Sequence, residues 1–415
     1  MNSLFSINLV VFLYVSMAFA HHPAMVRVPV ADLVGAPIHT FHLAKTVKES
    51  YAKIAYCGVV PTPTQGTPRI HQLLLHETVE IVSEDGDEVC IIIPQLFFIT
   101  HEHHKPQAMY WTLKKNLISF EKLGIQKENL IKIPQSPSYK NPLHINQNAN
   151  TVALTKPFFD PITQQTLSAG TRFIVDISKK LEQHAAVFVY NSNIGGFKTS
   201  FIPRDRIIPI QNRSMQQAIT CFVSLLKQWA HCHSGSIPYV WGGSSFTHCC
   251  NHPFKETKKR LVNGKYIDVY ERNECSQYPL SGFDCAGIIS RAAQICGIPY
   301  YFKNTYTLAH YLKSLSIDMH LQEGDLIWIP GHVMIVSDLK NNKIIEARGY
   351  SSNYGIVHEI PLQEIFKGIK TYSDLINVYH HQTPLTRLNK EGDEVEEIKK
   401  YKILKLSSVW DHTNY

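Results

Sequence analysis

One segment, residues 282–299, carries the clearest helix signals in the chain and places a cysteine in the first helical turn. Asp284 is a favourable N-cap residue, apolar residues follow at helical spacing, and Gly297 with Pro299 ends the pattern. Unpaired N–H groups and the positive end of the helix dipole favour a thiolate at this position. A single cysteine is more often a buried structural residue, so Cys285 needs further support as a nucleophile.

That support comes from a predicted hairpin downstream, which brings a histidine and a glutamate together. Gly331-His332 opens one apolar strand, residues 338–343 form a polar turn, and Glu346 lies in the returning strand. Opposed or diagonal neighbours on adjacent strands lie about 5–8 Å apart at Cβ, so an imidazole–carboxylate hydrogen bond is possible. The order Cys, His, Glu fits a nucleophile, a general base and a residue that orients the base. We therefore predict Cys285, His332 and Glu346 as a catalytic triad.

Five blocks of this region resemble, in the same order, the signature blocks of NlpC/P60 cysteine peptidases. They are Tyr239-Val240-Trp241-Gly242-Gly243, Phe283-Asp284-Cys285-Ala286-Gly287, Glu323-Gly324-Asp325-Leu326-Ile327, Gly331-His332-Val333 and Ile345-Glu346-Ala347. The resemblance implies the α+β class and a papain-like catalytic domain, in which the nucleophile at a helix start packs on an antiparallel sheet. It also implies hydrolysis of the bond between D-glutamate and diaminopimelate in the stem peptides of peptidoglycan or muropeptides.

The resemblance also suggests residues that contact the substrate. Tyr239 matches a tyrosine that lies over the active site, and Asp284 matches a carboxylate that meets the free amine of an L-alanine terminus. A tyrosine of the first domain can close that subsite, and Tyr110 is the candidate. The chain departs from the family at two positions. Ala286 replaces the usual serine, which puts strict recognition of a free amine in question, and Glu346 stands where histidine is more common.

Two further β-rich blocks precede the catalytic region. Residues 24–130 and 146–210 contain short runs of β-branched residues between turns rich in Gly, Pro and Asn, which is typical of small barrels. In the first block, residues 28–33, residues 72–79 and Tyr110-Trp111 resemble bacterial SH3 domains, and the second block is predicted to be another SH3-like domain. The catalytic domain is expected over 214–383 and begins with an amphipathic helix over 215–230. Residues 384–415 hold a mixed charge run and are predicted to be a solvated C-terminal tail.

The N-terminal residues 1–20 are predicted to be a signal peptide. They carry no charged side chain, contain a short apolar run, and end in Ala18-Phe19-Ala20. The run is too short to span a bilayer, so an exported protein, periplasmic or secreted and without a stable membrane anchor, is expected. The net charge of +7 suits a polyanionic partner such as cell wall, whereas the absence of a dense basic stripe argues against nucleic acid. A monomer is expected.

The nine cysteines leave at least one thiol unpaired within the chain. A disulfide from Cys275 to Cys249 or Cys250 is favoured over a metal site, because C-x-x-C spacing is absent. The His101-Glu102-His103-His104 cluster is interpreted as a solvated patch. No metal and no cofactor are therefore expected.

Two alternatives remain open. A CHAP-type amidase or peptidase also orders Cys before His before an acidic or amide residue, but the blocks at 239–243 and 283–285 favour the NlpC/P60 type. A non-catalytic protein that binds cell wall through its SH3-like domains is the other alternative. The intact set of Cys285, His332 and Glu346 argues against it.

Overall fold

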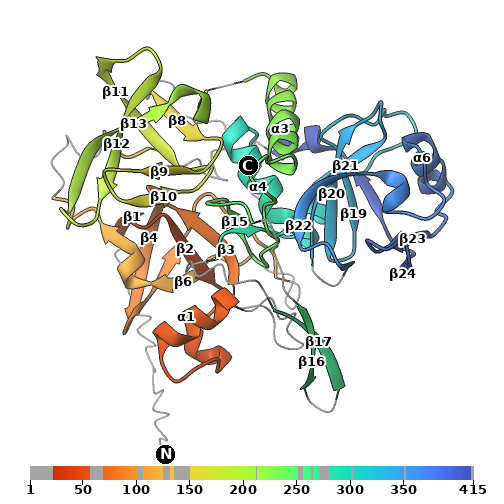
Figure 1. Ribbon diagram of the computed structural model, residues 1–415, viewed down its shortest axis with the longest axis horizontal. Helices are drawn as coiled ribbons and strands as arrows, with labels where there is room; N and C mark the ends of the chain where they lie inside the picture. The colour runs from red at the N-terminus through yellow and green to blue at the C-terminus, as the bar shows by residue number, and fades with distance from the viewer. Residues whose placement is uncertain are drawn as a thin grey trace, which may run out of the picture.

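The computed structural model arranges the chain as two β-sheet regions beside a third region that combines helices with a five-stranded sheet (Figure 1). The predicted signal peptide and the His101–His104 cluster lie outside the residues that the structure describes. No helix among the described residues is both long and apolar enough to cross a membrane. The structure describes residues 22–56, 69–100, 106–124, 131–134, 150–211, 213–250, 256–262, 265–271, 280–300, 302–349 and 352–412.

The first region is a seven-stranded antiparallel sheet in the order β3-β2-β6-β5-β4-β1-β7. Its strands are β1 (His22–Val26), β2 (Val30–Val34), β3 (Arg69–Leu74), β4 (Thr78–Asp85), β5 (Glu88–Ile92), β6 (Tyr110–Leu113) and β7 (Leu117–Ser119). Three short helices accompany them: η1 (Ile38–Phe41), α1 (Val47–Tyr56) and η2 (Lys114–Asn116). Among the described residues β3 and β7 remain edges, so the expected closed barrel is not seen.

The second region is a five-stranded antiparallel sheet in the order β13-β12-β11-β8-β14, with β9 and β10 as a separate hairpin. Its elements are β8 (Thr151–Leu154), β9 (Phe158–Asp160), β10 (Gln165–Leu167), β11 (Arg172–Lys180), β12 (His184–Asn191), β13 (Gly196–Pro203), η3 (Arg204–Arg206) and β14 (Ile207–Pro209). This sheet is also open among the described residues. The SH3-like identity of both regions therefore stays a prediction.

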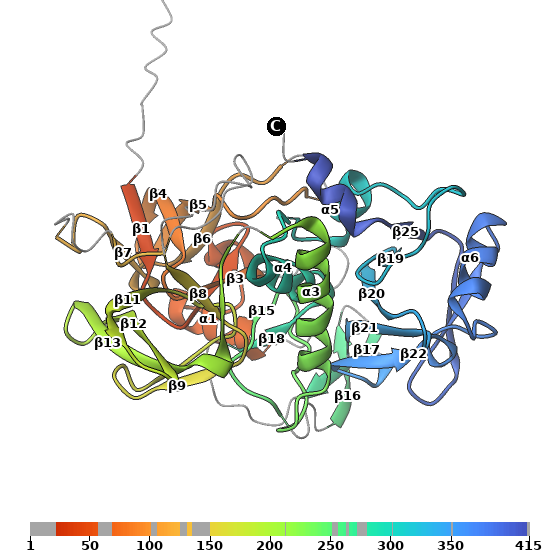
Figure 2. The ribbon, with the colours of Figure 1, turned by 90° about the horizontal axis from the view of Figure 1, so that it is seen from above.

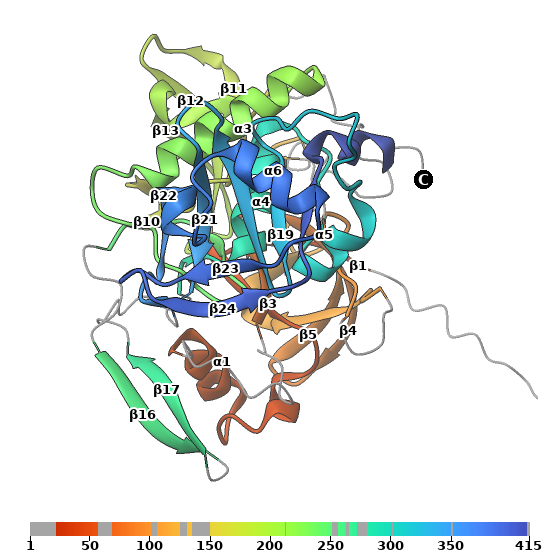
Figure 3. The same cartoon turned by 90° about the vertical axis from the view of Figure 1, so that its right-hand side faces the viewer.

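The third region starts with α3 (Met215–Ala230), whose bounds agree with the predicted amphipathic helix. A sheet in the order β22-β21-β20-β19-β25 follows. The bounds are β15 (Ser244–Ser245), β16 (Glu256–Val262), β17 (Lys265–Glu271), β18 (Gly282–Phe283), α4 (Cys285–Cys296), α5 (Thr305–Tyr311), β19 (Leu326–Ile329), β20 (His332–Asp338), β21 (Lys343–Arg348), β22 (Ile356–Pro361), η5 (Leu362–Glu364), α6 (Tyr372–His380), β23 (Leu385–Leu388), β24 (Glu394–Ile398), β25 (Lys402–Leu404) and η6 (Leu406–His412). The hairpin of β16 and β17 projects from the rest (Figure 3).

Helices cover both faces of this sheet (Figure 2). Side chains alternate along each strand, so Val333 and Ile335 pack in one apolar cluster with α3 and α4. Met334 and Val336 point the other way, into a second cluster that contains side chains of α6. The sheet is therefore the middle layer between two cores.

The residues expected to form a solvated tail belong to this fold. β25 pairs with β19 in the register Leu326↔Leu404, and so extends the central sheet by one strand. Lys405 forms a buried ion pair with Asp325, with Nζ 2.5 Å from Oδ2. The tail prediction was wrong from β23 onward, because three short segments separated by turns carry too little periodicity to be recognised as strands.

Candidate active site

The helix that carries Cys285 begins and ends where the sequence predicts. The Asp284 carboxylate caps it by accepting from the N–H of Gly287, and Gly297 closes it in the left-handed region with φ 80°. Gly287 has no room for a side chain, since a Cβ would lie 1.9 Å from the carbonyl oxygen of Gly243. The helix start therefore lies directly against the loop that precedes β15, and Cys285 is a buried free thiol.

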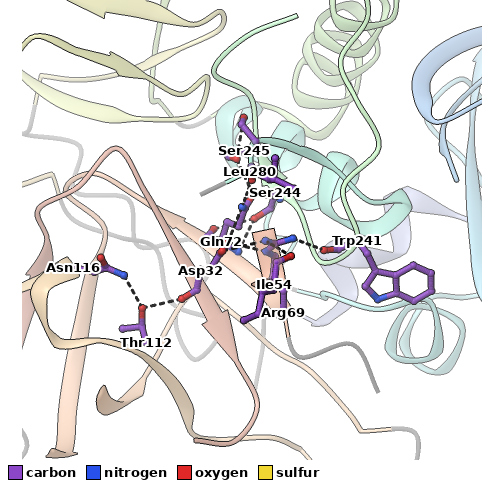
Figure 4. Close-up of polar contacts among 11 residues, drawn as sticks. Asp32, Ile54, Arg69, Gln72, Thr112, Asn116, Trp241, Ser244, Ser245 and Leu280 are labelled. Carbon is purple, nitrogen blue, oxygen red and sulfur yellow. Dashed lines mark hydrogen bonds and ion pairs between the residues drawn. The ribbon is translucent and has the colours of Figure 1, made fainter. Parts of the chain in front are cut away.

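Residues of the first region hold that loop in place (Figure 4). Arg69 donates from Nη1 to the Trp241 carbonyl at 3.2 Å while its Nε pairs with Asp32 at 2.8 Å. The N–H of Ser244 donates to the Gln72 side chain at 3.1 Å, and Gln72 donates in turn to Asp32. The contacts among Asp32, Gln72 and Ser244 are buried, so the first region is a structural part of the nucleophile's surroundings.

Arg291 connects α4, the helix that begins with Cys285, to the first region. Its guanidinium is buried and forms an ion pair with Glu77, with Nη1 2.6 Å from Oε1. It also donates to the backbone carbonyls of Ser244 and Gln72 at 2.9 and 3.0 Å. Sequence reasoning missed this residue, although a single arginine in an otherwise apolar helix stripe is the signal that could have indicated it.

His332 and Glu346 meet as the hairpin prediction required. The His332 Nε2 atom lies 2.6 Å from Oε2 of Glu346, and the carboxylate is fully buried. The register pairs Ile335 with Ile345, which makes the two residues diagonal rather than directly opposed. Because Nε2 is engaged by the carboxylate, Nδ1 is the ring nitrogen left for a proton from a nucleophile.

Three more side chains surround the Glu346 carboxylate, and none of them was predicted. His358 on the neighbouring strand lies 3.0 Å from Oε1, and Arg387 of β23 donates to Oε2 at 3.1 Å. Arg348 completes the set, with Nη1 3.6 Å from Oε1. The buried hydrogen bonds and charges of these residues therefore fix the orientation of the Glu346 carboxylate.

These surroundings set the protonation of the pair. Burial lowers the pKa of His332 to about 4, and the charge of Arg387 lowers it further. The hydrogen bond and charge of Glu346 work to raise this pKa but do not outweigh the other two effects. Burial works to raise the pKa of Glu346, yet hydrogen bonds from His332 and His358 hold it well below its usual range. At neutral pH the histidine is therefore a neutral imidazole beside an ionised carboxylate.

The thiol is also neutral, contrary to the expectation from the helix end. Burial and the adjacent charge of Asp284 raise the pKa of Cys285 to about 12, and the charge of Lys303 and the N–H groups of Val333 and Ala286 only partly oppose this. Desolvation of a thiolate outweighs the favourable end of the helix dipole here. The resting pair is therefore thiol and imidazole rather than thiolate and imidazolium.

The Cys285 thiol lies against the backbone at the start of β20, the strand that begins with His332. The N–H of Val333 is directed at the sulfur of Cys285, which puts the thiol beside the backbone of the histidine. Strand alternation places the histidine side chain on the face opposite the one that α4 covers, and no hydrogen bond joins the thiol to the ring among the described residues. Transfer of the thiol proton to the ring therefore requires the two side chains to approach each other when substrate binds.

The predicted substrate contacts have different outcomes. Tyr239 is buried, and the following residue Val240 bonds through its N–H to the carbonyl of Phe283, two residues before the nucleophile. Asp284 is engaged by the buried ammonium of Lys303 as well as by its capping contact. Tyr110 is buried in the apolar cluster of the first sheet, and its hydroxyl donates to the Gln107 carbonyl at 3.0 Å. The candidate role of Tyr110 in the active site was therefore wrong.

The structure also bears on the metal, cavity and disulfide predictions. Within the described parts of the chain, no three His, Cys, Asp or Glu side chains gather in a way that could hold a metal ion. A cavity of about 1100 Å³ lies along α3, lined among others by Cys232 and Cys249, and Cys285 does not line it. The predicted disulfide of Cys275 stays a prediction, since Cys275 lies outside the described residues.

Comparison with known proteins gives only distant likenesses. No protein-family model and no curated protein matches the chain. Among solved structures, an NlpC/P60 family protein from Bacillus cereus is 17% identical over 82% of this chain and 94% of that chain, with a TM-score of 0.48. NlpC2 from Trichomonas vaginalis is 11% identical over 83% and 94%, with a TM-score of 0.29. The peptidoglycan hydrolase RipB from Mycobacterium tuberculosis is 21% identical over 37% and 68%, with a TM-score of 0.23.

Two of these three structures are NlpC or NlpC/P60 proteins by name, and the third is a peptidoglycan hydrolase. At these identities and TM-scores the likeness is too distant to assign an activity. The function has to be inferred from the residues of the site.

Proposed function

We propose that the chain is an exported cysteine peptidase of the NlpC/P60 type that cleaves the D-glutamyl–diaminopimelate bond of peptidoglycan stem peptides. The observation that carries the proposal is the buried 2.6 Å hydrogen bond between His332 and Glu346, together with a free thiol at the start of α4. A histidine fixed in this way presents one defined ring nitrogen to a nucleophile. The order and residue types of the signature blocks supply the substrate class.

In the proposed mechanism Cys285 attacks the scissile carbonyl as its proton passes to Nδ1 of His332. The resting thiol is neutral, so the proton transfer accompanies attack rather than preceding it. At the start of α4 the N–H of Gly287 donates to the Asp284 carboxylate and that of Ala286 to the Cys285 sulfur. The N–H of Cys285 itself is the helix-start donor proposed to stabilise the negative charge that develops on the carbonyl oxygen. Glu346 stabilises the imidazolium that forms.

Collapse of the intermediate transfers the proton from His332 to the leaving amine and leaves a thioester on Cys285. Water then attacks the thioester, with His332 again accepting a proton, and the free carboxylic acid and thiol are regenerated. Tyr239 is the proposed substrate contact over this site. No step needs a metal or cofactor.

Incubation of the purified protein with muropeptides, followed by mass spectrometry, tests the proposal. The native protein is expected to produce a fragment that ends in D-glutamate together with a fragment that starts with diaminopimelate. Cys285→Ala should abolish both products, whereas Cys232→Ser, which changes a thiol in the cavity along α3, should leave them unchanged. Equal binding of muropeptides by the native and Cys285→Ala proteins with no turnover by either would instead indicate a wall-binding protein.

A further inference from the structure

The residue expected to receive a substrate amine already holds an ammonium of the protein itself. Lys303 Nζ lies 2.9 Å from Oδ1 and 2.7 Å from Oδ2 of Asp284. Oδ1 also accepts the capping hydrogen bond from Gly287. Both carboxylate oxygens are therefore occupied, and the lysine is 2% exposed.

The first region fixes Lys303 in this position. Its backbone N–H donates to the carbonyl of Phe97 at 3.1 Å, and Phe97 and Phe302 form a parallel bridge. The next residue, Asn304, donates to the Ile99 carbonyl at 2.8 Å. These contacts fix the main chain at Lys303, and burial of the side chain keeps the ammonium against the carboxylate.

Two buried polar atoms near the ion pair have no partner within the described part of the chain. The Tyr300 hydroxyl is fully buried and lies within electrostatic reach of Cys285 and Asp284. The Nδ1 atom of His71 is buried within reach of the Lys303 charge. Unpaired buried groups of this kind are rare in folded proteins; the Tyr300 hydroxyl lies near the nucleophile, and His71 lies near Lys303.

We propose that Lys303 closes the subsite beside Cys285 to a substrate ammonium, so that the protein takes stem peptides whose amino terminus is acylated. This inference rests on the proposed peptidase function. A free amine would meet the like charge of Lys303 and find no unoccupied carboxylate, whereas an amide is neutral and can hydrogen-bond with uncharged groups. Stem peptides still joined to the glycan strand carry such an amide at their L-alanine. The substrate class is therefore attached wall peptide rather than a released peptide with a free amine.

The test compares two tripeptides, L-Ala–D-Glu–diaminopimelate and its N-acetylated form. The native protein is expected to cleave the acetylated peptide with kcat/KM about tenfold or more above that of the free peptide. Lys303→Met should reverse the preference. The variant leaves the Asp284 carboxylate without its ammonium partner, and the free amine of the unacetylated peptide can take that place. Lys303→Arg keeps the charge and should keep the native preference. Higher kcat/KM of the native protein on the free amine would overturn the inference.

Binding separates this inference from the proposed function. The Cys285→Ala protein can be titrated with both peptides, and tighter binding of the acetylated peptide supports the inference even if no bond is cut. Equal or tighter binding of the free peptide overturns it. If Lys303→Met fails to fold, Lys303→Ala assayed with added ethylammonium replaces it. Ethylammonium should restore cleavage of the acetylated peptide and inhibit cleavage of the free one, and no differential effect would contradict the role of Lys303.

A second inference comes from an independent pair of thiols. The sulfur atoms of Cys221 on α3 and Cys296 at the end of α4 lie 3.0 Å apart. The hydrogen bond from Cys296 lowers the pKa of Cys221 to about 7, although burial works to raise it. The charge of Arg213 also lowers this pKa. A fraction of Cys221 is therefore thiolate at neutral pH, which is the nucleophilic form.

We infer that Cys221 and Cys296 form a disulfide in an oxidising compartment. The Cys221 thiolate attacks a disulfide oxidant such as oxidised glutathione and releases one thiol. Cys296 then loses its proton and displaces the second thiol, so the two cysteines give up two electrons and two protons in all. The product ties the end of the nucleophile helix to α3.

Incubation with oxidised glutathione, digestion without reduction and mass spectrometry test this pairing. A cross-linked peptide pair that contains Cys221 and Cys296, lost in Cys221→Ser, is expected. Oxidised protein in which both thiols still react with iodoacetamide after unfolding, or carry only glutathione adducts, would overturn the inference.

Discussion

Arg387 donates a hydrogen bond to Oε2 of Glu346 at 3.1 Å, and the same oxygen is 2.6 Å from Nε2 of His332. The arginine belongs to β23, in the part of the chain that the sequence presented as a tail. Burial lowers the pKa of His332 to about 4, and the charge of Arg387 contributes to the same shift. The C-terminal segment therefore takes part in setting the protonation state of the proposed base.

Arg387→Met is expected to move the acid limb of the pH–rate profile to higher pH. Imidazole accepts a proton only in its neutral form, so kcat/KM should fall as the pH falls through the pKa of His332. Loss of the neighbouring positive charge raises that pKa, and a shift of about one pH unit is expected. Arg387→Lys retains the charge and should keep an acid limb close to that of the native protein. Identical limbs in Arg387→Met and the native protein would contradict this electrostatic link.

Glu346→Gln should reduce both activity and stability. The amide cannot accept from two histidines and neutralise two arginines, so kcat should fall by about 100-fold or more through loss of the orienting hydrogen bond. Leaving Arg348 and Arg387 buried without their counter-charge should also lower the free energy of unfolding by about 3–5 kcal/mol. Urea unfolding and steady-state kinetics measure the two effects. Glu364→Gln, an exposed change in η5, is the control for both. A Glu346→Gln protein with native stability would show that the buried charges do not depend on the carboxylate.

The Cys285 thiol should alkylate slowly in the resting protein. Its pKa is raised to about 12, first by burial and then by the charge of Asp284, so very little thiolate exists at pH 7. The rate of modification by iodoacetamide, followed by mass spectrometry of the Cys285 peptide, should rise steadily with pH up to at least pH 10. An alkylation rate that is already fast and constant in mildly acidic buffer would show that Cys285 is a thiolate in the resting protein, as its position at the helix start suggested.

Local sequence signals predicted the helix that carries Cys285 but not the protonation state of its thiol. Asp284 and Gly297 marked the two ends of α4 correctly, because capping depends on residues within one turn. The hairpin was predictable for the same reason, since its turn and its apolar strands are contiguous. Protonation of the thiol is set instead by its burial in the folded molecule, which outweighs the opposing effects of the Lys303 charge and the Val333 N–H.

The ion-pair partners of Glu346 and Asp284 could not be predicted from the sequence, for a related reason. Arg387 and Lys303 lie 41 and 19 residues from the carboxylates that they bind, and neither sits in a recognisable motif. A buried ion pair is visible only once the fold brings its partners together. The charge run of residues 384–415 was interpreted as a solvated tail, which holds for the exposed side chains of β24 but not for Arg387.

Deletion of residues 384–415 is expected to prevent the catalytic region from folding. The deletion removes β25 from the edge of β19, the Arg387 contact with Glu346, and the Lys405 partner of the buried Asp325. A buried carboxylate without its partner is strongly destabilising. Soluble yield and thermal unfolding of the shortened protein measure the effect. Single substitution Lys399→Ala, an exposed change in the same segment, should leave both unchanged, and a stable, active shortened protein would restore the tail interpretation.

His76 should make the contact between the first two regions sensitive to acid. Its ring lies 3.0 Å from the Arg172 carbonyl through Nδ1 and accepts from the Tyr190 N–H at 3.1 Å through Nε2, so only the neutral form with its proton on Nδ1 fits. Burial lowers its pKa to about 4, although the hydrogen bond to the Arg172 carbonyl opposes this. Its contribution to stability is therefore complete above the unfolded pKa of about 6.5 and is lost as the pH falls through about 4.

His76→Gln can donate and accept in similar directions but does not titrate. The native protein should consequently lose up to about 3 kcal/mol more unfolding free energy than this variant between pH 7 and pH 4. Urea unfolding at several pH values, with hydrogen exchange at the Tyr190 amide, reports the change at the contact itself. His39→Gln, in an exposed position of the same region, serves as the control. Parallel stability curves for the native and His76→Gln proteins would mean that protonation of His76 is tolerated, and that the contact between the two sheets does not depend on a neutral ring.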